Sequence, residues 1–151
     1  LVEEAGLTYN GLHKDEFGKP YLKDNVHQIS LSHSYPLVAA QIDRFHPVGV
    51  DVEQPKEKLL KIAHRVLNKS EEADAGGSIQ KNCIYWCAKE ALYKIYGKRG
   101  LSFSEHLHVF PFVLNKSGSL IGKISSQNSE QLINLEYSLQ DDFVLVYTKT
   151  P

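Results

Sequence analysis

The chain has 151 residues, the length of one ordinary domain, and its 42% hydrophobic and 23% charged residues are a globular rather than a disordered composition. Seventeen Lys and Arg against eighteen Asp and Glu leave a net charge of −1, which favours neither nucleic acid nor a membrane surface as a partner. Two Cys cannot form a disulfide framework, so we expect a reducing, cytoplasmic location. The chain begins at Leu1 and contains no Met, from which we expect that residues precede Leu1.

The first third of the chain predicts a loop followed by short strands. Residues 14–20 are polar and carry Gly18 and Pro20, which is typical of a loop. Three apolar segments are predicted strands: residues 29–31, 37–42 and 48–52. Residues 32–36 form the predicted break between the first two, and the short connection at 43–47 favours antiparallel pairing of the second with the third.

Two helices are predicted in the middle of the chain. Apolar residues at i, i+3, i+4 and i+7 predict an amphipathic helix over 59–67, after Pro55 in its first turn. Residues 68–78 are polar and predict a mobile connection. A long helix is predicted over 79–96, with Gly97 as its stop, and its nearly all-apolar circumference is typical of a buried helix.

The remaining residues predict an all-strand segment. The expected strands cover 107–113, 120–124, 132–139 and 143–148, with a turn at 115–119. The predicted class is therefore α+β, a single domain over residues 1–151 with antiparallel strands around one long buried helix.

Acidic side chains on two of these elements are candidates for a site. Asp51 and Glu53 lie two apart on a strand, so both side chains leave one face, where a hard divalent cation with oxygen ligands would relieve their repulsion. A solvated strand end is the alternative. Glu90 interrupts an apolar face of the long helix, and because a buried carboxylate needs a partner, it is interpreted as part of a site rather than as a simple pair with Lys94.

A second group of residues suits an anion. Ser32 and His33 lie at a strand end, where a hydroxyl, an imidazole and backbone N–H groups can converge on an anion. Adjacent residues on an extended chain point apart, which excludes a Ser–His hydrolase. Lys19, between Gly18 and Pro20, offers a point charge suited to phosphate. Cys83 and Cys87 lie inside the apolar helix and are expected to be inert core thiols.

In this order the pieces resemble the 4′-phosphopantetheinyl transferase superfamily. The matching motifs are Gly-Lys-Pro-Tyr at 18–21, Ile-Ser-Leu-Ser-His-Ser at 29–34, Gly-Val-Asp-Val-Glu at 49–53, and Trp-Cys-Ala-Lys-Glu-Ala-Leu-Tyr-Lys at 86–94. Glu53 after Val52 is similar to the surfactin-type branch. The resemblance implies a single chain, a monomer, with two pseudo-symmetric halves.

The resemblance also implies an activity. Such enzymes use Mg²⁺ and coenzyme A, and they move the 4′-phosphopantetheine arm onto a serine of an apo acyl or peptidyl carrier protein, releasing 3′,5′-ADP. By resemblance, metal ligands are Asp51, Glu53 and Glu90, coenzyme A is held by Lys19, Ser32 and His33, and Lys94 lies near the transferred phosphate.

The chemistry of the matched residues agrees with this assignment but leaves points open. Lys94 and the cation would neutralise charge that develops on the phosphoryl oxygens, and Glu90 would accept the serine proton, directly or through a metal-bound water. The sequence leaves open whether Glu90 acts mainly as this base or as a metal ligand. Alternative functions are a non-catalytic homologue that binds coenzyme A or a carrier protein, and a Mg²⁺-dependent phosphodiesterase. Candidates for carrier docking are Arg65, Lys69, Lys98 and Arg99.

Overall fold

Within residues 1–23, 26–127 and 129–151, which the computed structural model describes, the chain forms nine strands and four helices. The helices are α1 Lys58–Val66, α2 Lys69–Ala75, α3 Ile79–Tyr96 and α4 Phe103–His106. The strands are β1 Leu12–Lys14, β2 Pro20–Leu22, β3 Gln28–Ser34, β4 Leu37–Asp43, β5 Val50–Glu53, β6 Leu107–Val109, β7 Ser117–Ser126, β8 Ser129–Leu139 and β9 Val144–Thr148. None of these helices is both long and apolar enough to cross a membrane.

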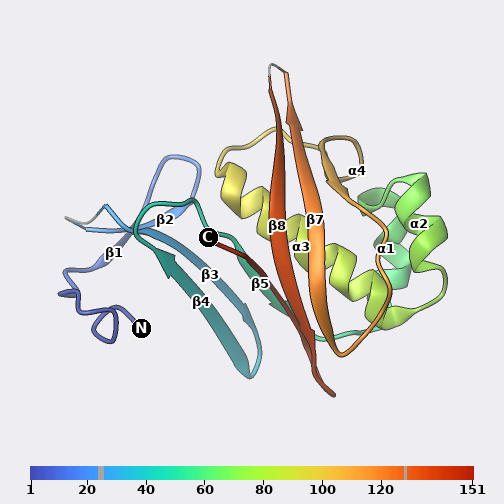
Figure 1. Ribbon diagram of the computed structural model, residues 1–151, viewed down its shortest axis with the longest axis horizontal. Helices are drawn as coiled ribbons and strands as arrows, with labels where there is room; N and C mark the ends of the chain where they lie inside the picture. The colour runs from blue at the N-terminus through green and yellow to red at the C-terminus, as the bar shows by residue number, and fades with distance from the viewer. Residues whose placement is uncertain (24–25, 128) are drawn as a thin grey trace.

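The strands form one large sheet and two hairpins. The large sheet has the order β5-β9-β8-β7-β6, and every neighbouring pair in it is antiparallel. The hairpins β1-β2 and β3-β4 lie to one side of it, with β3 and β4 nearest to β5 (Figure 1). The structure thus confirms the predicted combination of helices and antiparallel strands.

The predicted pairing of segment 37–42 with segment 48–52 is wrong. Segment 37–42 belongs to β4, which pairs with β3, and segment 48–52 overlaps β5, which pairs with β9. The predicted break at 32–36 is also too long, because β3 continues to Ser34, opposite Leu37. Such a tight turn lets neighbouring strands pair directly, whereas the longer connection after β4 carries the chain across to the other sheet.

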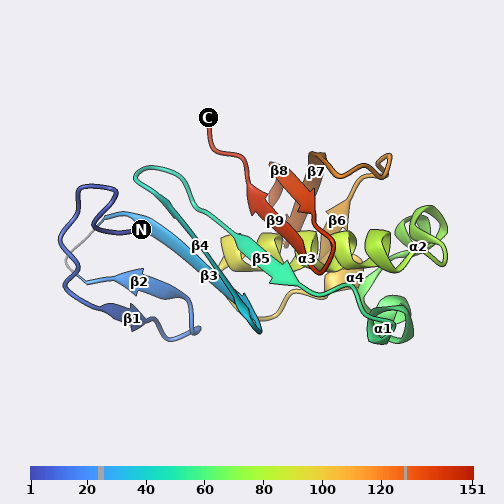
Figure 2. The same cartoon turned by 90° about the horizontal axis from the view of Figure 1, so that it is seen from below.

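Helix α3 lies along one face of the large sheet (Figure 2). Its predicted bounds are confirmed: the Ser78 side chain accepts a hydrogen bond from the Lys81 N–H at the start, and Gly97 ends the helix with a φ of 68°. Ten of its eighteen residues are buried. Against them pack the inward side chains of the sheet, among them Leu120, Ile124, Leu135, Val144 and Val146.

A glycine sets how closely β5 approaches α3. A Cβ atom on Gly49 would lie 2.1 Å from the Ala91 carbonyl oxygen, so only glycine fits between this segment and the helix backbone. The close approach places the start of β5 directly beside the C-terminal half of α3. Asp51, two residues later, therefore faces the last turns of that helix.

Residues 68–78, predicted as a mobile connection, contain helix α2. Asn68 and Glu71 form a capping box at its start, with each side chain bonded to the other residue's backbone N–H. The Glu71 carboxylate is fully buried and forms an ion pair with Lys89 of α3, 2.5 Å away. This tertiary contact stabilises a helix whose polar sequence has no apolar period to reveal it.

The last strands differ from prediction mainly in length. β7 begins at Ser117, inside the predicted turn at 115–119, and it pairs with β8 over ten residues. Strand β6 covers only Leu107–Val109 of the predicted 107–113. Long antiparallel pairing extends both β7 and β8 past their apolar cores into polar residues that face solvent.

Candidate functional site

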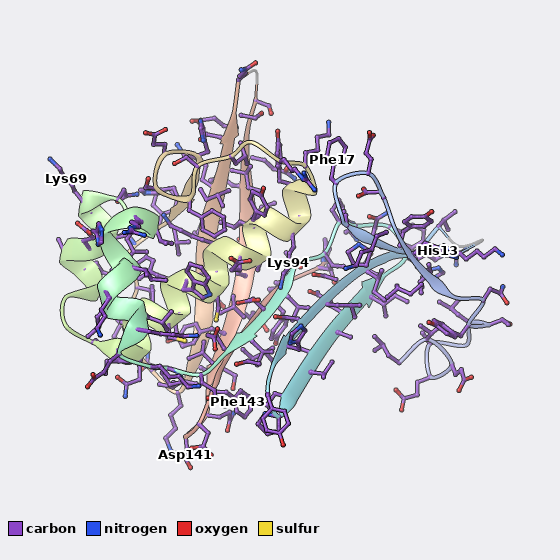
Figure 3. The ribbon with its side chains drawn as sticks, turned by 180° about the vertical axis from the view of Figure 1, so that it is seen from behind. His13, Phe17, Lys69, Lys94, Asp141 and Phe143 are labelled. Carbon is purple, nitrogen blue, oxygen red and sulfur yellow. The ribbon has the colours of Figure 1, made fainter. Side chains whose placement is uncertain are left out.

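A cleft of about 780 Å³ opens between the two hairpins and the C-terminal end of α3. It is lined from β3 by Ser32 and His33, from the loop before β2 by Lys19, and from α3 by Lys94. All four were predicted site residues. Figure 3 shows Lys94 at the crossing of α3 with β5, and Phe17 in the loop beside the end of α3.

Asp51 lies where β3, β5 and α3 meet. The residue is 6% exposed, and Oδ1 accepts hydrogen bonds from Ser32 Oγ at 2.6 Å and from Lys94 Nζ at 2.7 Å. Lys94 Nζ also donates to the Val50 carbonyl oxygen at 2.8 Å. A buried carboxylate is thus held by one hydroxyl and one ammonium group, which offsets its desolvation.

Glu53 lies on the same face of β5 and is partly buried. Its Oε1 accepts hydrogen bonds from Ser34 Oγ at 2.8 Å and from the Gln54 N–H at 2.9 Å. Its Oε2 lies 3.8 Å from Lys58 Nζ. The prediction that Asp51 and Glu53 share a face is confirmed by their parallel contacts with alternate serines of β3.

Glu90 is partly buried on α3 beside these two carboxylates. The pKa of its carboxyl is raised to about 7, chiefly by burial; the charges of Asp51 and Glu53 also raise it, whereas that of Lys94 opposes the rise. A carboxyl that titrates near neutral pH can take up and release a proton under ordinary conditions. One electrostatic cluster is therefore formed by residues up to 43 positions apart in the sequence: Asp51, Glu53, Glu90 and Lys94.

The three carboxylates supply the donor set that Mg²⁺ prefers, which is oxygen ligands that carry negative charge. Among the described residues, no three or more His, Cys, Asp or Glu side chains are already grouped as a metal site. Two of the three carboxylates instead bond to Ser32, Ser34 and Lys94. The residues fit the cation by the chemistry of their oxygen donors.

Lys19 lies against the end of α3. Its Nζ is 3.5 Å from the Ile95 carbonyl oxygen, and its stem crosses Gly97, where a Cβ would lie 2.7 Å from Lys19 Cδ. Burial lowers the pKa of Lys19, although the Asp15 carboxylate acts in the opposite direction. The lysine is thus held between the first hairpin and the negative end of the helix dipole.

Several cationic residues in the cleft were not predicted for it. Lys14 was not singled out, and the structure places Lys98 and Arg99, which were expected to dock a carrier, in the same cleft as Lys19 and His33. Their position follows from Gly97, which turns the chain back over the cleft after α3. The other two docking candidates, Arg65 and Lys69, are exposed at the far end of α3, where Figure 3 labels Lys69.

Buried groups on α3 lie outside the cleft. Cys83 and Cys87 are free and fully buried, and burial raises the pKa of the Cys87 thiol, as expected of core thiols. Lys89 Nζ donates to the carbonyl oxygens of Val66 and Phe103 at 2.8 Å and pairs with Glu71. Sequence spacing does not distinguish its structural role from that of Lys94.

Comparison with known proteins agrees with this arrangement. The family model of the 4′-phosphopantetheinyl transferase superfamily matches residues 47–148. Sfp of Bacillus subtilis strain 168, a 4′-phosphopantetheinyl transferase, is 36% identical over 105 residues, which are 62% of this chain and 46% of the relative. The transferase ffp of Bacillus subtilis is 38% identical with the same two coverages. The transferase gsp of Aneurinibacillus migulanus is 32% identical over 90 residues, 56% of this chain and 37% of the relative.

The chain therefore belongs to the 4′-phosphopantetheinyl transferase superfamily, and the resemblance to its surfactin-type branch is confirmed. It spans less than half the length of these three relatives. The matched region begins just before β5 and includes the carboxylate cluster and all of α3.

Proposed function

We propose that this protein transfers the 4′-phosphopantetheine arm of coenzyme A to a serine hydroxyl of an apo acyl or peptidyl carrier protein, releasing 3′,5′-ADP. The observation that carries the proposal is the cluster of Asp51, Glu53, Glu90 and Lys94 at the inner end of a cationic cleft. The relatives named as 4′-phosphopantetheinyl transferases support it.

The cleft is suited to coenzyme A by charge and by apolar surface. Its cationic lining consists of Lys14, Lys19, Lys94, Lys98 and Arg99, to which His33 adds an imidazole. Such a cluster attracts the phosphates of a coenzyme even though the whole chain has a net charge of −1. Phe17 and Tyr93 give the same cleft aromatic surface for the uncharged parts of the molecule.

Asp51, Glu53 and Glu90 are the residues that would hold Mg²⁺. When bound, the cation neutralises charge on the diphosphate oxygens and on the leaving phosphate. Asp51 and Glu53, each held by a serine hydroxyl of β3, suit the role of ligands. Because its pKa is near 7, Glu90 is better suited to the role of base.

Several residues of the chain act in one displacement reaction at the β-phosphorus of coenzyme A. The carrier serine oxygen forms a bond to the β-phosphorus of coenzyme A, and the bond from that phosphorus to the bridging oxygen of 3′,5′-ADP breaks. Glu90 accepts the serine proton. Lys94 stabilises the charge on the phosphoryl oxygens as it redistributes, while Lys19 and His33 hold the coenzyme in place.

The finer features of the resemblance belong to the same proposal. We assign residues 1–151 to one transferase domain that acts as a monomer in the cytoplasm, with pseudo-symmetric halves that meet at the cleft. The hairpin β3-β4 would contribute to the first half, and β5 with α3 to the second. Exposed cations at the end of α1 and the start of α2, Arg65 and Lys69 among them, would dock the acidic surface of the carrier.

The test is direct. The protein is incubated with coenzyme A, Mg²⁺ and an apo carrier protein, and the carrier is weighed by mass spectrometry. A gain of one phosphopantetheine mass, absent with Asp51→Asn, is the expected result. Coenzyme binding with no change in carrier mass would indicate a non-catalytic homologue, and cleavage of coenzyme A without a carrier would indicate a phosphodiesterase.

A further inference from the structure

Alternate serines of β3 face the edge of β5. Ser30 Oγ accepts a hydrogen bond from the Val50 N–H at 3.0 Å, and Ser32 Oγ accepts one from the Val52 N–H at 3.3 Å. Both strands have a side-chain period of two, so a third serine, Ser34, meets the last residue of β5 in the same register.

The last two serines of this row also donate to carboxylates. Ser32 Oγ lies 2.6 Å from Asp51 Oδ1, and Ser34 Oγ lies 2.8 Å from Glu53 Oε1. Ser30, by contrast, bonds to backbone alone in the contacts described here. Within this row, Ser30 bonds to the backbone of β5, and Ser32 bonds both to that backbone and to a carboxylate. The described bond of Ser34 is to a carboxylate.

The contact fixes one edge of the Glu53 carboxylate. Oε1 receives both Ser34 Oγ and the Gln54 N–H, which satisfies much of its acceptor capacity. Oε2 carries only the longer 3.8 Å approach of Lys58. With Oε1 bonded in this way, Oε2 is the oxygen that keeps the capacity to bind a further ligand.

We propose that Ser34 is a positioning residue, which orients Glu53 toward a divalent cation through its hydroxyl, and that Ser32 positions Asp51 in the same way. The inference rests on the proposed function in taking Asp51 and Glu53 as cation ligands. It adds a second row of residues that holds the ligands in place, and it gives Ser32 a role toward a carboxylate besides the one toward coenzyme A.

The hairpin end does not depend on this hydroxyl for its position. Gln54 Nε2 donates to the Tyr35 carbonyl oxygen at 2.8 Å, next to the Ser34–Glu53 contact. Strand pairing between β3 and β4 continues to Ser34 through the backbone. A variant that lacks only the Ser34 hydroxyl should thus fold as the natural chain does, with Glu53 free to rotate.

The experiment measures cation affinity rather than turnover. Mn²⁺ is used as the probe cation and its binding is followed by electron paramagnetic resonance, with and without coenzyme A, for the natural chain, Ser34→Ala, Ser34→Thr and Ser30→Ala. We expect Ser34→Ala to bind Mn²⁺ about 10-fold more weakly, the usual loss when a hydrogen bond to a metal ligand is removed. Ser34→Thr should restore the affinity because it keeps the hydroxyl.

Ser30→Ala is the matched control. It removes the acceptor of the Val50 N–H and should lower the melting temperature while leaving Mn²⁺ affinity unchanged. Equal affinity in Ser34→Ala and the natural chain would overturn the inference, as would failure of the natural chain to bind Mn²⁺. Phosphopantetheine transfer, measured separately by carrier mass, decides the proposed function, so failure of one does not imply failure of the other.

Discussion

The Glu90 carboxyl is mostly withdrawn from water and faces two other carboxylates. Its folded pKa of about 7 lies above the ordinary value of 4.5, so the folded chain keeps a proton that the unfolded chain releases as pH rises from 4.5 to 7. The stability that this proton provides is therefore present below pH 4.5 and is lost progressively up to about pH 7. At pH 8 the charged Glu90 destabilises the fold.

We predict that Glu90→Gln is more stable than the natural chain at pH 8, by about 1–2 kcal/mol after allowance for solvent screening. The gain should shrink toward zero at pH 5, where Glu90 is itself neutral. Urea denaturation at both pH values measures the difference. Glu16→Gln, in an exposed loop, is the control and should show no such trend; a gain for Glu90→Gln that does not depend on pH would contradict the assignment.

At the scale of single residues, the sequence predicts candidates for the charged residues of the site. The resemblance adds Lys94. Spacing on a strand and on a helix selects Asp51, Glu53 and Glu90 as candidates, because each period fixes the face on which a side chain lies. It does not separate Lys89 from Lys94, since both are lysines on one helix and only the neighbours of the helix decide which faces a cleft. The role of Ser34 depends on contact between two strands that do not pair, which no local pattern encodes.

Strand β5 and helix α3 form the contact on which the site depends. We predict that Gly49→Ala destabilises the fold by about 3 kcal/mol, because the added methyl group meets the rigid Ala91 carbonyl rather than a mobile side chain. Thermal denaturation should show a fall of roughly 2–4 °C for each kcal/mol in a chain of this size. Gly77→Ala, which meets nothing within 4 Å, is the matched control.

Displacement of β5 from α3 should also disturb the Asp51–Lys94 pair. An unchanged melting temperature in Gly49→Ala would mean that the two elements are further apart than the structure places them.

Helix α2 is joined to α3 by the buried Lys89–Glu71 pair, in which both side chains are fully buried. Lys89→Met leaves the Glu71 carboxylate buried without its cation, and we predict a loss of about 3–5 kcal/mol. In a Glu71→Gln background the same change should cost much less, because the amide needs no counter-charge. A double-mutant cycle in urea gives the coupling; strictly additive losses would contradict the pair.

Helices and strands were predicted correctly where local sequence signals are strong. The prediction failed where contacts between residues far apart in the sequence determine the structure. The apolar circumference and Gly97 are sufficient to define α3 from the sequence. Helix α2 has a capping box but no apolar period, and its stability comes from Lys89, which lies outside its own segment. The partner of β5 is β9, about a hundred residues later, and short connections favour the wrong neighbour.

The whole molecule presents cations on two separate faces. Lys98 and Arg99 line the cleft with Lys19, whereas Arg65 and Lys69 are exposed beyond the opposite end of α3. We predict that Lys98→Glu with Arg99→Glu raises KM for coenzyme A by about tenfold or more, because like charge then faces the phosphates. KM for the carrier should change little.

The reciprocal double variant, Arg65→Glu with Lys69→Glu, should raise KM for the carrier and leave KM for coenzyme A unchanged. Steady-state kinetics with each substrate varied in turn separates the two faces. If Lys98→Glu with Arg99→Glu alters the carrier KM alone, those residues belong to the docking surface instead.

Strand β5 is the outermost strand of the large sheet, and a backbone left open at such an edge recruits strands from other molecules. The hydroxyls of Ser30 and Ser32 already accept the N–H groups of Val50 and Val52. An intruding strand would have to break these bonds before it could add itself to the sheet. The serine row, together with the hairpin β3-β4 that carries it, thus protects this edge of the sheet from edge-to-edge aggregation.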